Sequence, residues 1–335
     1  MAVSLAPRVK VLNKEFKRDD NDTVLCTDGI KLEFDGTILD LSQSWQHGEE
    51  LAPIFSGACW AGTVVWQAAL DLCDFMSEHF REDLAGATVV ELGCGIGVPG
   101  MIARLLGATV ILTEQDELLS LLDRNIASNF FQDLGSAGDG GTDAAGSIRR
   151  AALDWERTAD ADGIIASLNP SPDEKRTPES NSAGAGLEDG SNGGGSDRAR
   201  RDGKVADYAN TFASDGREML EAQLGRKKRP DFILCADCVF EPLYGDSWKA
   251  LAKVMGRLSD TGTTVLCSVE RRGEDGVPQF FSACVAEGFK LQLVFLAAPD
   301  APSPVEIYEF SRKGARDGFR CKAVGGGSVD LGDGK

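Results

Sequence analysis

Residues 89–100, which read VVELGCGIGVPG, combine an apolar run with closely spaced glycines. The run predicts a strand. Gly93, Gly95 and Gly97 would let the chain turn so tightly that backbone N–H groups and the start of a helix face a ligand. The spacing G-x-G-x-x-G, followed by an acid at Glu114, satisfies the dinucleotide fingerprint. The same letters also suit the E-x-G-x-G-x-G loop that cradles S-adenosylmethionine, and glycines that only pack are a third alternative.

Two side chains in this stretch favour S-adenosylmethionine over a dinucleotide. Pro99 fits the first turn of a helix, but it removes one of the N–H groups that a pyrophosphate would use. Glu91, just before the glycines, would place a second anion beside a diphosphate. An amino-acid tail next to a sulfonium is the better electrostatic partner for that carboxylate.

Further acids and aromatic residues stand at the ends of the next two predicted strands. Glu114 ends the strand 109–114, where a carboxylate can accept hydrogen bonds from both ribose hydroxyls; the alternative is an exposed helix cap. Asp154 and Trp155 end the strand 151–155 at the same edge of the sheet. There a carboxylate can accept from the adenine amino group and an indole can cover the ring, although a core role is also typical of such a tryptophan.

Alternating helices and strands must position these residues, because apolar residues recur at helical spacing in some segments and form short runs in others. Helices are expected at 63–80, 101–106, 117–130, 246–255 and 276–289, and strands at 89–92, 109–114, 151–155, 231–237, 263–270, 290–296 and 305–312. The pattern predicts an α/β fold with a Rossmann-like seven-stranded, mostly parallel sheet and helices on both faces. Since no helix separates the last two strands, the last strand is expected to run antiparallel at or near the edge.

Composition divides the chain into four parts. They are an N-terminal β-hairpin extension (1–60), a core in two segments (61–156 and 230–312), a flexible Gly- and Ser-rich insertion (157–229) and a disordered tail (313–335). The hairpin is expected to turn at Asp35-Gly36. Within the insertion, residues 217–224 could form a short helix.

The charge balance restricts the class of partner. The sequence has 53 acidic and 35 basic residues and a formal net charge of −18, which argues against nucleic acid and suits a cationic ligand or a basic peptide. No apolar run approaches the length of a membrane span, so we expect no membrane partner, and we expect a monomer. Residues 226–229, RKKR, are either a nuclear import signal or the exposed end of the insertion.

Cysteines carry further information about compartment and metal binding. Nine cysteines scattered along the chain indicate reduced thiols in a cytoplasmic or nuclear protein. Cys235 and Cys238 form one C-x-x-C pair, but there is no second pair and only two histidines, so we expect no metal site. In a strand their sulfur atoms would lie on opposite faces, as in two core cysteines.

Six short motifs occur in one order: GTVVW (62–66), VVELGCGIGVPG (89–100), ILTE (111–114), LLDRNIASN (121–129), LDW (153–155) and ADCVF (236–240). In this order the sequence resembles the seven-β-strand protein lysine methyltransferases of the methyltransferase-16 group. The resemblance covers residues 28–156 and 230–312. It implies methyl transfer from S-adenosylmethionine to a lysine of a protein substrate, with elongation factors and chaperones as the acceptors of relatives.

The resemblance also implies roles for single residues. Asp237 and Phe240 match the D-x-x-[YF] motif that frames the target lysine and are the expected catalytic residues. The expected cofactor-binding residues are Trp66, Glu91, Gly93, Gly95, Gly97, Glu114, Asp154 and Trp155. The sequence departs from the family pattern at Glu114 (commonly Asp), Phe240 (commonly Tyr) and Glu156 (commonly Gly), and its insertion is unusually long.

Methyl transfer needs alignment of the amine, and the amine must be neutral. Asp237 alone would raise the pKa of a nearby lysine, so we expect it to dock and orient the ammonium while the proton is lost to water; a helix-capping acid is the alternative. Tyr244 or Trp248 could join Phe240 in walling the alkyl chain. Glu270-Arg271-Arg272 either borders the substrate groove or forms a solvated turn.

Three other functions stay open at this point. One is methyl transfer to a small amine or to another protein side chain. A second is a nicotinamide-dependent oxidoreductase, which Glu91, Pro99 and the Trp66 helix disfavour. The third is a non-catalytic module that keeps the fold and the cofactor for contacts with a partner.

Overall fold

The computed structural model describes residues 8–12, 17–18, 24–25, 29–43, 61–134, 146–169, 227–315 and 319–322. Met1–Leu168 and Arg229–Lys335 form one compact unit, and Asn169–Lys228 form a second. In the second unit, the N–H of Lys228 donates to Asn169 Oδ1 at 2.5 Å, and the side-chain amide of Asn169 donates to the carbonyl of Lys228 at 3.0 Å. These two hydrogen bonds hold the ends of that unit together.

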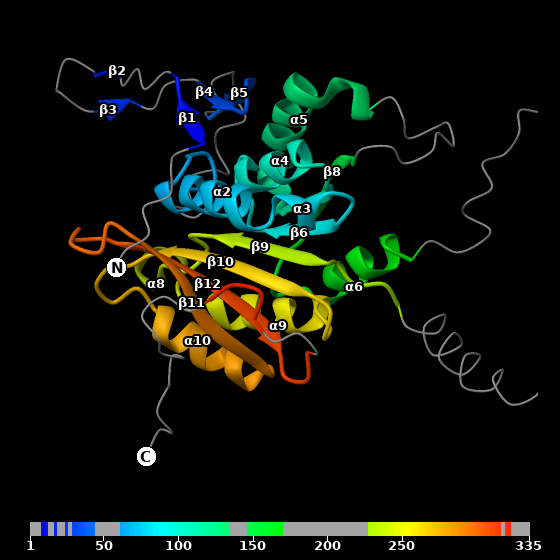
Figure 1. The fold of residues 1–335 in the computed structure, drawn as a ribbon, viewed down its shortest axis with the longest axis vertical. Helices are drawn as coiled ribbons and strands as arrows, with labels where there is room; N and C mark the ends of the chain where they lie inside the picture. Colours follow the sequence, from blue (N-terminus) through cyan, green and yellow to red (C-terminus); the bar gives the residue numbers. More distant parts are fainter. Residues whose placement is uncertain are drawn as a thin grey trace, which may run out of the picture. The chain divides into compact units, whose positions relative to one another are not determined.

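A seven-stranded sheet runs through the described part of the first unit (Figure 1). In spatial order its strands are β11 (Phe289–Ala297), β12 (Val305–Arg312), β10 (Thr264–Glu270), β9 (Phe232–Ala236), β6 (Thr88–Leu92), β7 (Thr109–Glu114) and β8 (Ile148–Ala152). β12 pairs antiparallel with both of its neighbours, and the pairs from β10 to β8 are all parallel. The predicted fold class is confirmed, including the antiparallel last strand next to the edge.

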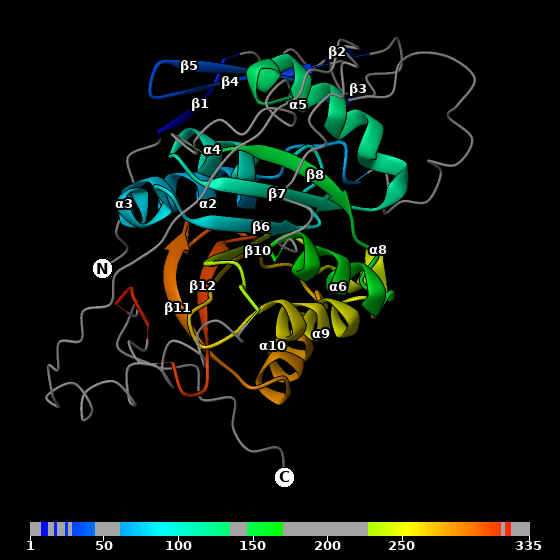
Figure 2. The same ribbon diagram turned by 90° about the vertical axis from the view of Figure 1, so that its right-hand side faces the viewer.

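Helices cover both faces of this sheet. One face carries α2 (Gln67–His79), α4 (Val98–Leu105) and α5 (Leu119–Leu134), with the short α3 (Arg81–Leu84) after α2. The other face carries α6 (Thr158–Ser167), α9 (Trp248–Leu258) and α10 (Val277–Ala286). Figure 2 shows these three helices on the side of the sheet away from α2 and α4. No helix in the described ranges has the length and apolarity needed to cross a membrane.

β6 shows how the sheet divides its side chains between two hydrophobic cores. All five of its residues are buried, as expected for a central parallel strand covered on both faces. Val89 packs in the core under α2 and α4, whereas Val90 packs in the core under α6 and α9, because neighbouring residues in a strand point to opposite faces. Glu91 follows the alternation and points towards α4, where its hydrogen-bond partner lies.

The N-terminal residues form a small sheet of their own. β4 (Gly29–Phe34) and β5 (Thr37–Ser42) are joined by a tight turn at Asp35 and Gly36, both with positive φ, and β1 (Val9–Val11) pairs with β4. Asn125 and Asn129 of α5 exchange hydrogen bonds with the backbone of β5. β2 (Lys17–Arg18) and β3 (Val24–Leu25) form a separate pair.

The third strand of the parallel set begins earlier than predicted. β8 covers residues 148–152 rather than 151–155, so Asp154 and Trp155 lie in the loop after it. β8 is an edge strand with exposed Arg149 and Arg150. Because an edge strand tolerates charged residues, its sequence lacks the apolar run by which the neighbouring strands were predicted.

Two ordered segments lie where the sequence predicts flexibility. α6 falls within the predicted insertion, yet Ala161, Ile164 and Ile165 are buried in the core under α9. Near the C-terminus, the N–H groups of Arg320 and Cys321 donate to the buried carboxylate of Glu309 at 2.6 and 2.9 Å. Residues 170–226, including the predicted helix at 217–224, lie outside the described residues.

Gly100 in the first turn of α4 is expected to tolerate no side chain. A Cβ there would lie 2.6 Å from Glu91 Oε2 and even closer to the side chain of Leu112. Gly100→Ala should therefore destabilise the protein by about 1–3 kcal/mol through overpacking. Chemical denaturation measures this change in the free energy of unfolding.

The matched control is Gly163→Ala in α6, where a Cβ would meet nothing within 4 Å. That variant should gain about 0.5–1 kcal/mol, because alanine loses less conformational freedom than glycine in a helix. Equal denaturation midpoints for the two variants would contradict the packing argument.

Candidate functional site

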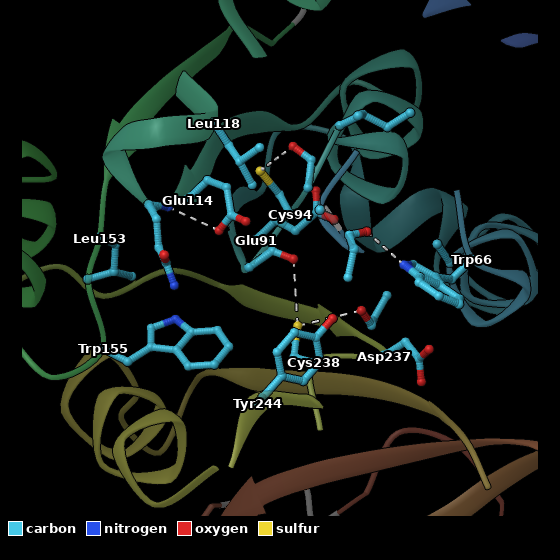
Figure 3. Close-up of a pocket in the computed structure, with 18 of the residues that line it drawn as sticks. Trp66, Glu91, Cys94, Glu114, Leu118, Leu153, Trp155, Asp237, Cys238 and Tyr244 are labelled. Atoms are coloured by element: carbon cyan, nitrogen blue, oxygen red, sulfur yellow. Dashed lines mark hydrogen bonds between the residues drawn. The ribbon is translucent and has the colours of Figure 1, made fainter. Parts of the chain in front are cut away.

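One cavity of about 270 Å³ lies at the carboxyl ends of β6, β7 and β9 and beside the loop after β8. Its walls come from residues 61–69, from the glycine loop after β6, from the loops after the other three strands, and from α8 (Glu241–Tyr244) and the start of α9. The carboxyl ends of parallel strands are where ligands bind in open α/β sheets. The cavity is therefore the candidate site (Figure 3).

Most of the predicted cofactor residues border this cavity. They are Trp66, Glu91, Gly93, Gly95, Glu114, Asp154 and Trp155. Gly97 does not border it; Gly97 precedes α4 with a φ of 85° and lies against the side chains of Leu112 and Leu122. Asp237 borders the cavity, whereas Phe240 does not.

The glycine loop lies directly beneath two other parts of the wall. A Cβ on Gly95, whose φ is 53°, would lie 2.7 Å from the carbonyl oxygen of Gly62. A Cβ on Gly93 would lie 2.9 Å from the ring of Trp155 and 3.0 Å from Cys238 Sγ. The loop therefore needs glycine both for its backbone conformation and for the close approach of its neighbours.

Glu91 is a fully buried acid in the cavity wall. Its Oε2 accepts a 2.7 Å hydrogen bond from the N–H of Gly100. Burial raises the pKa of Glu91 to about 8, and the charge of Glu114 acts in the same direction. Near neutral pH the carboxyl group is therefore mostly protonated, so charge repulsion of a diphosphate is weaker than the sequence argument assumes.

The start of α4 disfavours a diphosphate for another reason. Pro99 has no N–H, and the N–H of Gly100 points inward to Glu91 rather than towards the cavity. The last glycine of the dinucleotide fingerprint thus binds the protein's own acid. This use of helix N–H groups leaves fewer donors for a pyrophosphate than the fingerprint requires.

Glu114 and Trp155 form one end of the cavity (Figure 3). Glu114 ends β7 and accepts a 3.1 Å hydrogen bond from the N–H of Gln115. Burial raises the pKa of Glu114 to about 7, and Glu117 adds to this shift. The indole of Trp155 and the side chains of Leu118 and Leu153 supply apolar surface there. This end can hold a flat ring next to a carboxyl group.

Asp154 borders the cavity, but its carboxylate organises the loop. Oδ1 accepts from the N–H of Glu156 at 3.0 Å, and Oδ2 accepts from Nε of Arg157 at 3.1 Å. Asp160 also accepts a hydrogen bond from the N–H of Asp154. Each carboxylate oxygen retains one lone pair, so Asp154 can accept at most one further hydrogen bond per oxygen.

Asp237 and Trp66 form the opposite end of the cavity (Figure 3). Asp237 follows β9 with a φ of 54°, a left-handed conformation in which Asp is one of the enriched residues. Trp66 caps α2, and its indole N–H donates to the carbonyl of Ala61 at 3.0 Å. Tyr244, between the two ends, provides the aromatic wall that the sequence analysis assigned first to Phe240.

Sequence analysis missed the partner of Asp237. Arg272 donates to both carboxylate oxygens, from Nη2 at 2.8 Å and from Nη1 at 3.2 Å. Its guanidinium also lies 5.0 Å from the ring centre of Phe240. Residues 270–272 (ERR) stand where β10 ends, but no sequence pattern indicates that Arg272 reaches the end of the neighbouring strand β9.

Ser247 was also missed. It precedes α9 and borders the cavity, and its Oγ is buried without a hydrogen-bond partner among the described residues. A serine before a helix predicts a cap, but here the hydroxyl caps nothing. A buried hydroxyl without a protein partner in a cavity wall can bind a polar atom of a ligand.

The prediction that Cys235 and Cys238 point to opposite faces is wrong. The chain leaves the strand at Asp237, and the left-handed turn there brings the two buried thiols into contact. The S–H of Cys238 also donates to the carbonyl of Leu92 at 3.3 Å. In the part of the chain that the structure describes, no three His, Cys, Asp or Glu side chains are grouped to hold a metal ion.

Comparison with known proteins gives a family match. Residues 56–165 match the family described as lysine methyltransferase. This match confirms the resemblance inferred from the sequence.

Three curated relatives illustrate the similarity. Secreted RxLR effector protein 48 of Plasmopara viticola is 33% identical over 191 residues, which cover 56% of this chain and 64% of that protein. Protein N-lysine methyltransferase METTL21A of Danio rerio is 45% identical over 69 residues, covering 21% and 31%. EEF1A lysine methyltransferase 3 of Xenopus tropicalis is 42% identical over 65 residues, covering 19% and 29%. The matched regions span less than two thirds of each of these relatives.

Solved structures resemble the chain more distantly. A putative RNA methyltransferase from Pyrococcus horikoshii is 16% identical with a TM-score of 0.36, covering 73% of this chain and 83% of that one. A TehB-like SAM-dependent methyltransferase from Corynebacterium glutamicum is 14% identical with a TM-score of 0.38, covering 78% and 96%.

The raised pKa of Glu91 predicts how stability depends on pH. The folded-state pKa of about 8 lies above the ordinary value of 4.5, so folding takes up a proton between these values. The stability that this proton provides is complete below pH 4.5 and decreases by at most about 1.4 kcal/mol per pH unit as the pH rises towards 8. Glu91→Gln cannot ionise, so it should gain stability relative to the wild type from about pH 5 to about pH 8.

Chemical denaturation of both proteins across this pH range tests the expectation, with Glu117→Gln, a change at an exposed acid, as the control. Parallel stability curves for the wild type and Glu91→Gln would refute the assigned proton.

Proposed function

We propose that the protein is an S-adenosylmethionine-dependent protein lysine methyltransferase, because residues 56–165 match the lysine methyltransferase family. One observation carries the proposal. A single cavity has a ring-binding end at Glu114 and Trp155 and an acidic, aromatic end at Asp237 and Trp66 (Figure 3). A methyl donor and an acceptor amine need such a shared space, because transfer depends on their alignment.

The residues present fit S-adenosylmethionine. Glu114 would accept hydrogen bonds from the ribose hydroxyls, and Trp155 would cover the adenine. Glu91, beneath the glycine loop, would face the positive charges of the amino-acid part. Ser247 offers the unpaired hydroxyl described above. When bound, this cofactor supplies a methyl group on a positively charged sulfur.

The two raised pKa values support a cationic ligand in particular. Near neutral pH Glu91 is mostly protonated and Glu114 partly so, because burial penalises their charged forms. A cation in the cavity would favour the ionised forms and release these protons. A diphosphate would have the opposite effect, so the electrostatics favour the methyl donor over a dinucleotide.

The end of the cavity at Asp237 would receive the side chain of the acceptor. A lysine with an ordinary pKa near 10.4 needs about 4.6 kcal/mol to become neutral at pH 7. Trp66 and Tyr244 would exclude water around its alkyl chain, and an apolar environment lowers an amine pKa. Asp237 would accept a hydrogen bond from the amine and orient its lone pair towards the methyl group.

A protein with an exposed lysine in a basic segment is the proposed substrate, since the chain carries a net charge of −18. The name of one relative gives EEF1A as its acceptor, so EEF1A is the first purified acceptor to test. The cytoplasm is the proposed location, with the nucleus as the alternative. The free cysteines among the described residues support a reducing compartment.

Cofactor binding is tested by titration calorimetry with S-adenosylmethionine. Glu114→Ala should weaken binding about tenfold or more, because hydrogen bonds to a carboxylate contribute about 1.5–3 kcal/mol. Glu117→Ala is the matched control, since Glu117 is exposed and does not border the cavity. Equal losses in both variants, or tighter binding of NAD than of S-adenosylmethionine by the wild type, would overturn the cofactor assignment.

Transfer of a radiolabelled methyl group from S-adenosylmethionine into a whole-cell protein extract and into purified EEF1A tests the activity. The wild type should label a discrete protein band, and Asp237→Ala should lose most of the label because the amine is no longer oriented. Asp246→Asn, which removes an exposed acid paired with Lys249, should label normally. Asp237→Asn keeps the shape of the side chain. Loss of label in this variant as well would therefore come from lost orientation of the amine rather than from misfolding.

The other possible outcomes distinguish the alternative functions. Labelling of free amines without protein labelling would indicate a small-molecule methyltransferase. Binding of S-adenosylmethionine without transfer to any acceptor would indicate a non-catalytic module. The absence of both binding and transfer would exclude a methyltransferase.

A further inference from the structure

Arg272 binds the carboxylate that faces the acceptor end of the cavity. Asp237 accepts two hydrogen bonds from this guanidinium and a third, at 3.2 Å, from the N–H of Glu270. The side chain of Asp237 is only 3% exposed. A buried carboxylate with this two-pronged partner is strongly destabilised when the partner is removed, so Arg272 is held there firmly.

Further contacts fix the guanidinium itself. Nη2 also donates to Glu270 Oε2 at 2.7 Å. The guanidinium carbon lies 5.5 Å from the ring centre of Trp66 and 5.0 Å from that of Phe240. Although burial opposes the charge of Arg272, its hydrogen bonds with Asp237 and the nearby acids raise its pKa. Arg272 is therefore a permanent cation anchored by two acids and two aromatic rings.

Arg272 does not border the cavity, but two of its partners do. Asp237 and Trp66 form part of the cavity wall, whereas Arg272, Glu270 and Phe240 lie behind it. Any effect of Arg272 on an acceptor must therefore act through these wall residues. This placement gives Phe240 a role that the sequence did not suggest, as a support for Arg272.

We infer that Arg272 is a positioning residue for the proposed methyl transfer: it orients Asp237 and Trp66 and balances the carboxylate charge, so that the acceptor is bound as a neutral amine. The inference rests on the proposed function. An uncompensated Asp237 would stabilise an ammonium, whose nitrogen has no lone pair to attack a methyl group. With Arg272 in place, Asp237 can still accept a hydrogen bond from the amine, but its charge favours the ammonium form less.

Other ionisable groups face this pair from every element packed around it. They are Glu270 at the end of β10, with Asp71 of α2 beside it, Asp275, which accepts from the N–H of Arg272, Tyr244 on α8, and Cys238 next to Asp237. All of them are anionic or neutral. Arg271 is directed towards Asp275 and Glu306. Arg272 is thus the cation bound to Asp237, and its removal should favour the protonated amine.

The test compares Arg272→Gln, Arg272→Lys and Arg271→Gln with the wild type. Arg271 is the matched control, because it stands in the same turn and binds Asp275 and Glu306, neither of which borders the cavity. The readouts are S-adenosylmethionine affinity, thermal unfolding, and methyl transfer over a dilution series of the whole-cell extract, at about pH 7 and about pH 9. The dilution series separates the maximal rate from the half-saturating acceptor concentration.

Arg272→Gln should lower the maximal rate about tenfold or more at pH 7, with cofactor affinity changed less than about threefold. The loss should be smaller at pH 9, where more of the amine is neutral. Arg272→Lys should recover part of the rate because it keeps the charge, although it lacks the planar fork. Arg271→Gln should keep the wild-type rate and cofactor affinity, although its thermal stability should fall because the buried Asp275 loses its partner. The double variant Asp237→Asn/Arg272→Gln should lose no more than the worse single variant, since the two side chains act as a unit.

Three results would overturn the inference. A higher rate or a lower half-saturating acceptor concentration in Arg272→Gln would make Arg272 a gate that the acceptor displaces. Parallel losses of thermal stability, cofactor affinity and rate at both pH values would make it purely structural. An unchanged rate would make it irrelevant to transfer. If the wild type itself labels nothing, the proposed function fails, and that outcome is distinct from all three.

Discussion

The hydrogen bond from the N–H of Gly100 to Glu91 connects the strand, the glycine loop and the helix on which the candidate site depends. It joins β6 to the first turn of α4, and there is no space for a side chain at Gly100 because Leu112 and Glu91 lie against it. With α4 held this close to the sheet, the loop between them must turn through glycines. The loop therefore forms the floor of the cavity, and the ends of β7 and β9 are positioned relative to it.

The fold could be predicted because its signals are local. Buried parallel strands such as 109–114 are continuous apolar runs, and the structure gives β7 these same bounds. Prediction failed where burial is one-sided or involves few residues. The charged Arg149 and Arg150 hid the start of an edge strand that was predicted at 151–155. Acids and a glycine hid α6, because its buried residues (Ala161, Ile164 and Ile165) are few. These elements are stabilised by tertiary packing rather than by a strong pattern of their own.

The candidate site was predictable only in part, because its residues follow two kinds of rule. Residues at strand ends, such as Glu114 and Asp237, can be placed from the topology, since parallel strands share one edge. Contacts between strands cannot be placed in this way. Arg272 reaches Asp237 across 35 positions of sequence, and this pairing needs both the left-handed turn at Asp237 and the register of β9 with β10.

The acids at the two ends of the cavity differ in how their charge is compensated. Glu91 and Glu114 have no basic partner among the groups that shift them, and burial instead raises the pKa of each, so that near neutral pH Glu91 is mostly and Glu114 partly protonated. Asp237 is also buried, but it is paired with Arg272. An acid without a basic partner can bind a cationic cofactor. An acid that is already paired with a cation can accept a hydrogen bond from a neutral amine while favouring the protonated amine less. In the proposed function, the same negative chain would attract a positively charged donor at one end of the cavity and keep the nucleophile uncharged at the other.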